Sequence, residues 1–251
     1  MASIDAPVVD GPGADVLTCA PTPANLAARW SGENSTSDDK GLFQGTPHGQ
    51  FAYTQGRFGS AFLFDGTSAY MTADNSDTLW PMDSFSITAW VKASGITATS
   101  YVVVKYGGGG STASDGNDYE IGMNTSGNPF FVIRVDGSPS NSIILTATTV
   151  NVIDSQWHYL VAERDNAAME LRLYIDGARA VSRAISGPDL GAMSNVDHAP
   201  DPVTISGYIR SGTDAIAGLF AGAVDSVAYF SGALSDEEVA AIYAAPDGEC
   251  R

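Results

Sequence analysis

Short stretches in which apolar and polar residues alternate recur along this chain, and they constrain its fold more than any other feature. In the segment 84–91 every second side chain, beginning with Phe85, is apolar, which places these side chains on one face of an extended strand. Residues 131–135 and 171–175 alternate in the same way. Residues 157–164 are apolar on both faces, as in a strand that is covered on both sides. The pattern predicts a protein built mainly of strands.

Turn signals separate these strands. Three of them end in an Asp-Gly pair, at residues 65–66, 136–137 and 176–177, and this pair supplies the positive φ angles of tight hairpin turns. Hairpins at short intervals, with scarcely any helical periodicity, predict an all-β fold of two antiparallel sheets packed as a sandwich. One short helix is expected near the C-terminus, where Ser235 and Glu238 form a capping box before an apolar stripe.

The length and composition fit a single domain. The chain has 251 residues, of which 44% are apolar, enough for one large core. Residues 1–18 are rich in Pro, Gly and Asp, so we expect a flexible leader there and a folded domain at 19–251. No apolar run reaches the roughly 20 residues of a membrane span. The N-terminus also lacks the regions of a secretory signal, so a replaced signal and synthesis without one both stay open.

The charge of the chain limits its partners. Acidic residues outnumber basic ones by 29 to 12, and the formal net charge is -17. Such a charge repels phosphate backbones and anionic lipids, so we expect no nucleic-acid partner and no insertion into a membrane. It favours cations and basic partners instead.

The two cysteines, Cys19 and Cys250, flank the predicted domain. A disulfide between them would join the ends of the domain and, in the chain-entropy model, stabilise it by about 4–5 kcal/mol. It would also imply an oxidising compartment, so we expect an extracellular or cell-surface location. Two free thiols are the alternative.

Six motifs follow one another along the chain: Ala28–Glu33, Gly56–Gly66, Phe85–Val91, Trp157–Tyr159, Leu173–Gly177 and Gly222–Phe230. This ordered series resembles the laminin G-like domains, which are jelly rolls of the concanavalin A-like class. The similarity extends from about Cys19 to Cys250 and is greatest to bacterial members with a terminal cysteine pair, which supports the disulfide. It implies two curved antiparallel sheets.

The resemblance also implies a calcium site. Relatives carry an acidic calcium ligand where this chain has Asp225, which shares a strand face with apolar residues. A buried carboxylate needs a partner, and an oxygen-ligated cation such as Ca²⁺ is one. Asp38 matches the family's early acid, and main-chain carbonyls near Gly56 would complete the shell. The alternative is that turn amides satisfy Asp225 and that Asp38 is solvated.

A polar, glycine-rich segment at 106–120 and a separate loop edge supply the candidate ligand contacts. The segment does not match an EF-hand, because Glu120 falls where the turn needs Gly. A flexible connection is the alternative for this loop, and ordinary packing is the alternative for its aromatic residues. The candidate ligand-binding residues are Trp80, Tyr106, Asp115, Asn117, Asp118 and Tyr119.

The superfamily includes lectins, adhesion modules and glycan-active enzymes, so the fold does not decide the function. Apart from Asp118 and Glu120, no closely spaced acidic pair suggests a glycosidase, and the three histidines form no zinc or nucleophile motif. We therefore expect a non-catalytic, calcium-stabilised module that binds carbohydrate or glycoprotein. One alternative is a structural or decoration subunit of a virion or cell surface, in contact with other protein subunits. Another is a polysaccharide lyase or hydrolase.

Overall fold

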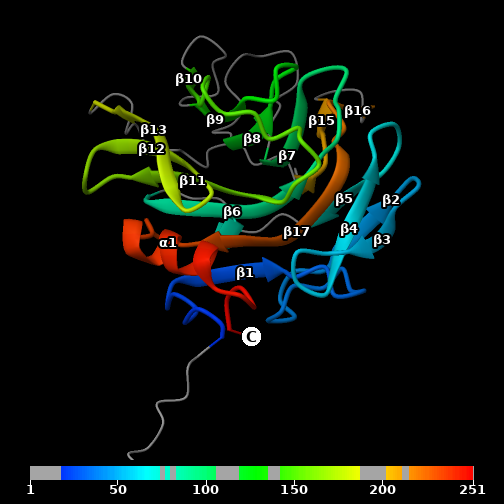
Figure 1. Cartoon of the computed structure of the whole chain (residues 1–251), viewed down its shortest axis with the longest axis horizontal. Coiled ribbons are helices and arrows are strands. Elements are labelled where there is room, and N and C mark those ends of the chain that lie inside the picture. Colours follow the sequence, from blue (N-terminus) through cyan, green and yellow to red (C-terminus); the bar gives the residue numbers. More distant parts are fainter. Residues whose placement is uncertain are drawn as a thin grey trace, which may run out of the picture.

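The computed structural model describes residues 18–73, 77–79, 83–105, 119–134, 142–186, 202–210 and 215–250. They form two antiparallel sheets stacked as a sandwich, together with a 3-10 turn, η1 (Asp77–Leu79), and an α-helix, α1 (Asp236–Ala244) (Figure 1). The expected all-β sandwich with a short C-terminal helix is confirmed. The leader expected at 1–18 lies outside the described residues, apart from Thr18.

The first sheet has eight strands, in the order β13-β12-β11-β6-β17-β4-β3, with β1 paired to β17 beside this path. All its pairs are antiparallel. Its strands are β1 (Leu26–Trp30), β3 (Ala52–Gln55), β4 (Ser60–Asp65), β6 (Phe85–Lys92), β11 (His158–Asp165), β12 (Glu170–Ile175), β13 (Ala178–Ala184) and β17 (Ala221–Phe230).

The second sheet has seven strands, in the order β10-β9-β8-β7-β14-β5-β2, and a separate ribbon pairs β15 with β16. The strands of the sheet and the ribbon are β2 (Gly45–His48), β5 (Tyr70–Ala73), β7 (Ser100–Lys105), β8 (Tyr119–Met123), β9 (Pro129–Arg134), β10 (Ser142–Thr146), β14 (Val203–Ile205), β15 (Tyr208–Arg210) and β16 (Ala215–Ala217).

The central strands of the first sheet are buried on both faces. Phe85 and Val91 of β6 point into the main core between the sheets, whereas Trp90 packs on the outer face. In β11, Leu160 points into the main core and Val161 packs on the outer face. This confirms the alternation predicted for residues 84–91 and the two apolar faces predicted for 157–164.

Helix α1 covers part of the outer face of the first sheet. The Ser235 hydroxyl accepts a hydrogen bond from the Glu238 amide, and the Glu238 carboxylate accepts one from the Ser235 amide, so the predicted capping box is present. Val239 and Ile242 are buried against the sheet. No helix of the described residues has the length and hydropathy of a membrane span.

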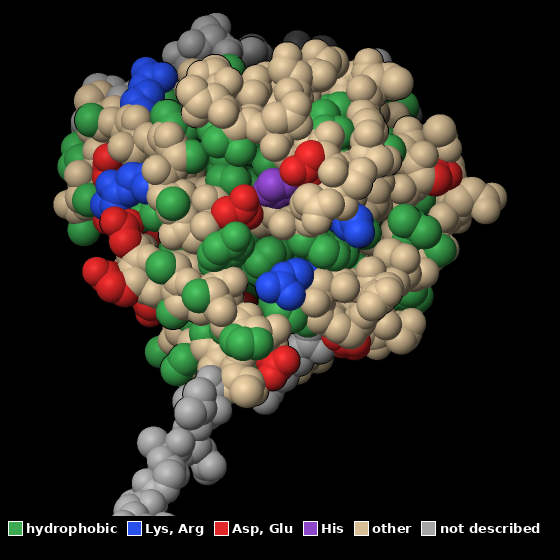
Figure 2. All heavy atoms as spheres, in the orientation of Figure 1, with side chains coloured by type: hydrophobic (Ala, Val, Ile, Leu, Met, Phe, Trp, Pro, Cys, Tyr) green, Lys and Arg blue, Asp and Glu red, His purple; other side chains and the backbone are tan. Residues whose placement is uncertain are grey.

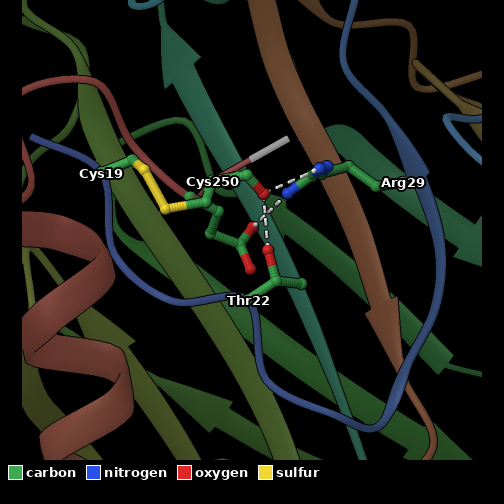
Figure 3. Close-up of a disulfide and its surroundings, with 5 residues drawn as sticks. Cys19, Thr22, Arg29 and Cys250 are labelled. Atoms are coloured by element: carbon green, nitrogen blue, oxygen red, sulfur yellow. Dashed lines mark hydrogen bonds and ion pairs between the residues drawn. A yellow bond between two sulfur atoms is a disulfide. The ribbon is translucent and has the colours of Figure 1, made fainter. Parts of the chain in front are cut away.

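The predicted disulfide joins Cys19 and Cys250 across a sequence separation of 231 (Figure 3). The two terminal segments are also hydrogen-bonded beside the disulfide, where the Cys250 amide donates to the Ala20 carbonyl at 2.8 Å. We call residues 18–22 and 246–250, with this disulfide, the terminal clasp. It holds the two ends of the described chain side by side (Figure 1).

The buried Arg29 ties this clasp to β1. Its guanidinium donates to the Cys250 carbonyl at 3.4 Å, and the Thr22 hydroxyl donates to the same carbonyl at 2.6 Å (Figure 3). Arg29 also forms ion pairs with Asp39 at 2.6 Å and with Glu249 at 3.5 Å. The ends are therefore fixed by polar contacts as well as by the covalent bond.

Two of the three Asp-Gly pairs can be compared with the structure. Asp176 and Gly177 have φ angles of 53° and 79° and close the predicted hairpin between β12 and β13. The hairpin predicted at Asp65-Gly66 is wrong, because this turn leads from β4 in one sheet to β5 in the other. There the Asp65 carboxylate accepts hydrogen bonds from the amides of residues 67–69. The pair at 136–137 lies outside the described residues, although β9 and β10 on either side of it do pair.

Candidate ligand-binding face

A hollow of about 290 Å³ opens on the outer face of the first sheet. It lies where Leu63 of β4, Ala223 of β17 and Lys92 of β6 stand side by side in register. Phe62, Val91 and Val224, next to these three in sequence, point into the core, so the three themselves point outward. The hollow is lined by Thr54, Gln55, Leu63, Lys92, Ala93, Ser94, Ser155, Gly222 and Ala223. We call it the outer-face hollow.

The lining combines an apolar floor with a polar rim. Leu63 is 38% exposed, and among the large apolar side chains that the structure describes it shares such exposure with Leu42 and Ile144 alone. The rim carries hydroxyl, amide and ammonium groups, and none of the lining residues is acidic. Gly222 lets β17 approach β6 closely, because a Cβ there would lie 2.3 Å from the main-chain oxygen of Lys92. A larger residue at this position would alter the floor.

The turn at residues 56–59, between β3 and β4, is fastened to β17 next to this hollow. The buried Asp225 accepts a hydrogen bond from the Phe58 amide at 3.0 Å and another from the Ser226 hydroxyl at 3.0 Å. A Cβ at Gly56 would lie 2.5 Å from Oδ2 of Asp225, so only glycine permits this contact. The carboxylate therefore fixes the position of the turn.

This turn presents Arg57 on the same face of the sheet. The guanidinium carbon lies 4.8 Å from the centroid of the Phe58 ring and 4.9 Å from that of Trp90, both within range of a cation–π interaction. Trp90 and Lys92 are two residues apart on β6 and point to the same side. Among the described residues neither Arg57 nor Lys92 forms a salt bridge, so this face of the sheet carries two cations without an acidic partner there.

A second hollow, of about 470 Å³, lies on the other side of Arg57, against the terminal clasp. Glu33, Asp247 and Glu249 contribute acidic side chains to its wall. Charge thus changes from basic to acidic along this part of the surface. On the face shown in Figure 2, basic side chains stand singly and some have acidic side chains beside them, so this face offers no continuous basic field for a polyanion.

A laminin G-type model of the concanavalin A-like lectin/glucanases superfamily matches residues 65–240, more than two thirds of the chain. The chain belongs to this superfamily. The resemblance found in its motifs is thereby confirmed. A comparison with curated protein sequences finds no significant match.

Solved structures show the same fold for this superfamily member. Domain 4 of AbnA, an extracellular GH43 arabinanase from Geobacillus stearothermophilus, in complex with arabinotriose, is 22% identical, with a TM-score of 0.64 over 86% of this chain and 97% of that domain. The binding domain of Paraclostridial Mosquitocidal Protein 1 is 14% identical (TM-score 0.65), over 87% of this chain and about half, 52%, of that one. A CBM40 of a Ruminococcus gnavus IT-sialidase, bound to α2,3 sialyllactose, is 17% identical (TM-score 0.54), over 66% and 85%.

The residues expected to bind calcium, Asp225, Gly56 and Asp38, do not form one site in the structure. Asp225 and Gly56 are in contact, as described above. The Asp38 carboxylate instead accepts hydrogen bonds from the amides of Lys40, Leu42 and Phe43, at 3.1, 2.6 and 2.6 Å, and shapes its own loop. Within the described part of the chain, no three acidic, His or Cys side chains gather closely enough to hold a metal ion. Calcium therefore stays a prediction from the family resemblance.

The expected ligand-binding residues lie mostly outside the described residues. These are Trp80, Tyr106, Asp115, Asn117 and Asp118. Tyr119 is described, and it is 1% exposed in the core, where its hydroxyl donates to the Leu79 carbonyl at 3.2 Å. Burial raises the pKa of this phenol. The structure therefore offers Tyr119 no exposed ring face.

A charged cluster stands at the edge of the outer-face hollow. Nδ1 of His158 lies 2.8 Å from the Asp176 carboxylate, and Nε2 lies 3.0 Å from that of Asp154, the residue before Ser155 of the hollow. Both nitrogens can donate only when the ring is protonated. The hydrogen bond to Asp176, with a further one to Asp154, raises the pKa of His158 against the opposing effect of burial. When it is protonated, the ring thus fastens the Asp154 loop to the β12–β13 turn.

Sequence reasoning did not identify Leu63, Lys92 or Arg57 as site residues. The hollow needs the β3–β4 hairpin, β6 and β17 to lie next to each other, and these come from three separate parts of the chain, at 52–65, 85–92 and 221–230. A partial signal was present, since the Gly56–Gly66 and Gly222–Phe230 motifs both border the hollow. Their glycines mark close approaches of the main chain, which the sequence alone could not assign to a surface.

Proposed function

We propose that this protein is a non-catalytic carbohydrate-binding module whose binding surface is the outer-face hollow. The observation that supports this proposal is the chemistry of the lining. Leu63 and Ala223 form an apolar floor, and hydroxyl and amide groups surround it. Saccharides present apolar C–H faces edged by hydroxyls, and such a surface complements them. The likeness to a whole arabinanase domain solved with arabinotriose supports the same class of ligand.

The lining also supports a binding rather than a catalytic role. A retaining or inverting glycosidase needs two carboxyl groups across the scissile bond, about 5–9.5 Å apart. The described residues that line the hollow include no Asp or Glu. The lysine, amide and hydroxyl groups there would hold a saccharide without supplying the acid and the nucleophile of hydrolysis.

Location, partners and calcium belong to the same proposal. The Cys19–Cys250 disulfide favours an oxidising, extracellular setting, where polysaccharides and glycoproteins are available as partners. The described residues do not collect a calcium ligand set, so we assign calcium no contact in saccharide binding. A melting temperature that rises with Ca²⁺ and falls with a chelator would support a structural ion near Asp225.

A glycan-array screen tests the proposal. The wild-type chain is compared with Leu63→Asp, which places a charge on the floor of the hollow. The matched control is Leu42→Asp, since Leu42 is 67% exposed on the loop between β1 and β2 and does not line the hollow. We expect selective saccharide binding by the wild type and the control, and at least tenfold weaker binding by Leu63→Asp. An array without any bound saccharide would overturn the carbohydrate proposal, and equal binding by both variants would overturn the assignment to this hollow.

A further inference from the structure

We propose that the saccharide recognised at the outer-face hollow carries a carboxylate group, and that Lys92 is the residue that selects for it. This inference rests on the proposed function and names the chemical class of its ligand. It follows from three features of the hollow: the balance of donors and acceptors in its lining, the lack of an acidic partner for Lys92, and the distribution of charge around it.

Every polar side chain of the rim can donate a hydrogen bond, and the Lys92 ammonium can only donate. The Lys92 ammonium has three protons and no lone pair, Gln55 offers an amide NH₂, and the hydroxyls of Thr54, Ser94 and Ser155 can each donate. The lining has no carboxylate to accept hydrogen bonds from the hydroxyl protons of a neutral sugar. An ionised carboxylate only accepts, with two oxygens, so it complements this rim better than a hydroxymethyl group does.

Lys92 is one of the described cations of this acidic chain that have no acidic partner. Most described arginines have an acidic partner: Arg29 pairs with Asp39, Arg134 with Glu120, Arg172 with Glu163 and Arg179 with Asp236. Lys92 forms no salt bridge or side-chain hydrogen bond within the described residues, although the net charge of the chain is -17. Its ammonium is exposed beside the hollow and is free to pair with a bound anion.

The surrounding charges give a bound anion a preferred orientation. Arg57 adds a second positive charge on the same face, held over Trp90. Beyond it, Glu33, Asp247 and Glu249 make the hollow at the terminal clasp acidic. A saccharide with one carboxylate therefore lies with that group toward Lys92. A densely charged polyanion would meet these acids, so we infer a ligand with a single or widely spaced carboxylate.

The test uses matched ligand pairs and calorimetric titration of the whole chain. Each pair is a uronic-acid oligosaccharide and its carboxyl-reduced form, which differ only in a carboxylate or a CH₂OH group. We expect the acidic member of one pair to bind about five- to tenfold tighter at about 0.01 M salt. This advantage should largely disappear at about 1 M salt, where screening is nearly complete.

The variant Lys92→Met keeps the apolar stem and removes the charge. It should lower the affinity for the acid to that for the reduced sugar, and leave the reduced sugar unaffected. The control is Arg183→Met, because Arg183 is exposed on the edge strand β13, away from the hollow, and should change neither affinity. Unchanged melting temperatures verify that both variants fold.

Three results would overturn the inference in distinguishable ways. Equal binding of both members of every pair, lost in Leu63→Asp, would remove the carboxylate preference and leave the saccharide site intact. An acid preference that survives in Lys92→Met would remove the assignment to Lys92. Binding of no member of any pair, and of no saccharide on the array, would remove the proposed function together with this inference.

Discussion

Removing the Cys19–Cys250 disulfide is a perturbation whose cost can be worked out from the structure. The bond closes a loop with a sequence separation of 231. In the chain-entropy model, loss of a cross-link over such a loop destabilises the folded state by about 5 kcal/mol at 25 °C. For a domain of this size each kcal/mol shifts the melting temperature by about 2–4 °C, so we expect a decrease of about 10–20 °C.

The polar contacts of the terminal clasp do not reduce this estimate. The hydrogen bond between Cys250 and Ala20 and the contacts of Arg29 exist only in the folded chain. They hold the native ends together after the covalent bond is gone, but they place no limit on the unfolded chain. The cost of losing the disulfide comes mainly from the larger freedom of that unfolded chain, and it should appear in full.

The assay is thermal unfolding followed by circular dichroism, for the wild type and the double variant Cys19→Ser, Cys250→Ser. The wild type is measured with and without reductant, and the reduced wild type should match the variant. Reductant should leave the variant itself unchanged. A decrease of less than about 3 °C would refute the reasoning, because the unfolded chain would then have to be restrained by something other than this bond.

Three smaller effects are expected. Gly56→Ala should destabilise the fold by roughly 1–3 kcal/mol in urea unfolding, because the new Cβ would clash with Asp225. The control Gly95→Ala should change the unfolding free energy little, because there is open space around Gly95. Similar values for the two variants would contradict the clash. Ser235→Ala should cost about 1 kcal/mol by removing the N-cap, and Ser235→Asp should restore most of it. The two aspartate partners of His158 raise its pKa in the folded protein. Their interaction with the protonated ring therefore stabilises the fold fully below the pKa of histidine in the unfolded chain, and this stabilisation disappears as the pH rises through the higher pKa of the folded protein. The difference in unfolding free energy between wild type and His158→Gln should therefore be larger near pH 5 than near pH 8, and a constant difference would be evidence against the pairing.

The sequence predicted the class of the fold because alternation and capping are local. The apolar residues of 84–91 and the capping box at Ser235 lie where the pattern placed them. The hairpin at Asp65-Gly66 was mispredicted because this pair fixes only the turn geometry. Whether the next strand stays in the same sheet depends on distant pairing, here of β4 with β17 and of β5 with β14.

The candidate site was less accessible to sequence reasoning for the same reason. Its floor comes from Leu63 and Ala223, which alternate with core residues and look like ordinary strand positions. Asp225 was correctly singled out as a buried carboxylate. The expectation that it shares a face with the apolar Val227 and Tyr229 is wrong, because an irregularity in β17 after Asp225 shifts the alternation and leaves those two side chains in the core between the sheets. The hydrogen bond that Asp225 accepts from the Phe58 amide depends on a turn far away in sequence. A single sequence identifies such a residue as unusual without naming its partners.

The terminal clasp has a mechanical consequence. A force applied between the chain before Cys19 and the chain after Cys250 would pass through one covalent bond, because these residues are bonded to each other. The strands between them would bear almost none of that load. In its oxidised form the domain can thus be part of a chain under tension while the outer-face hollow keeps its shape, and in its reduced form the same tension would reach β1 and α1 directly.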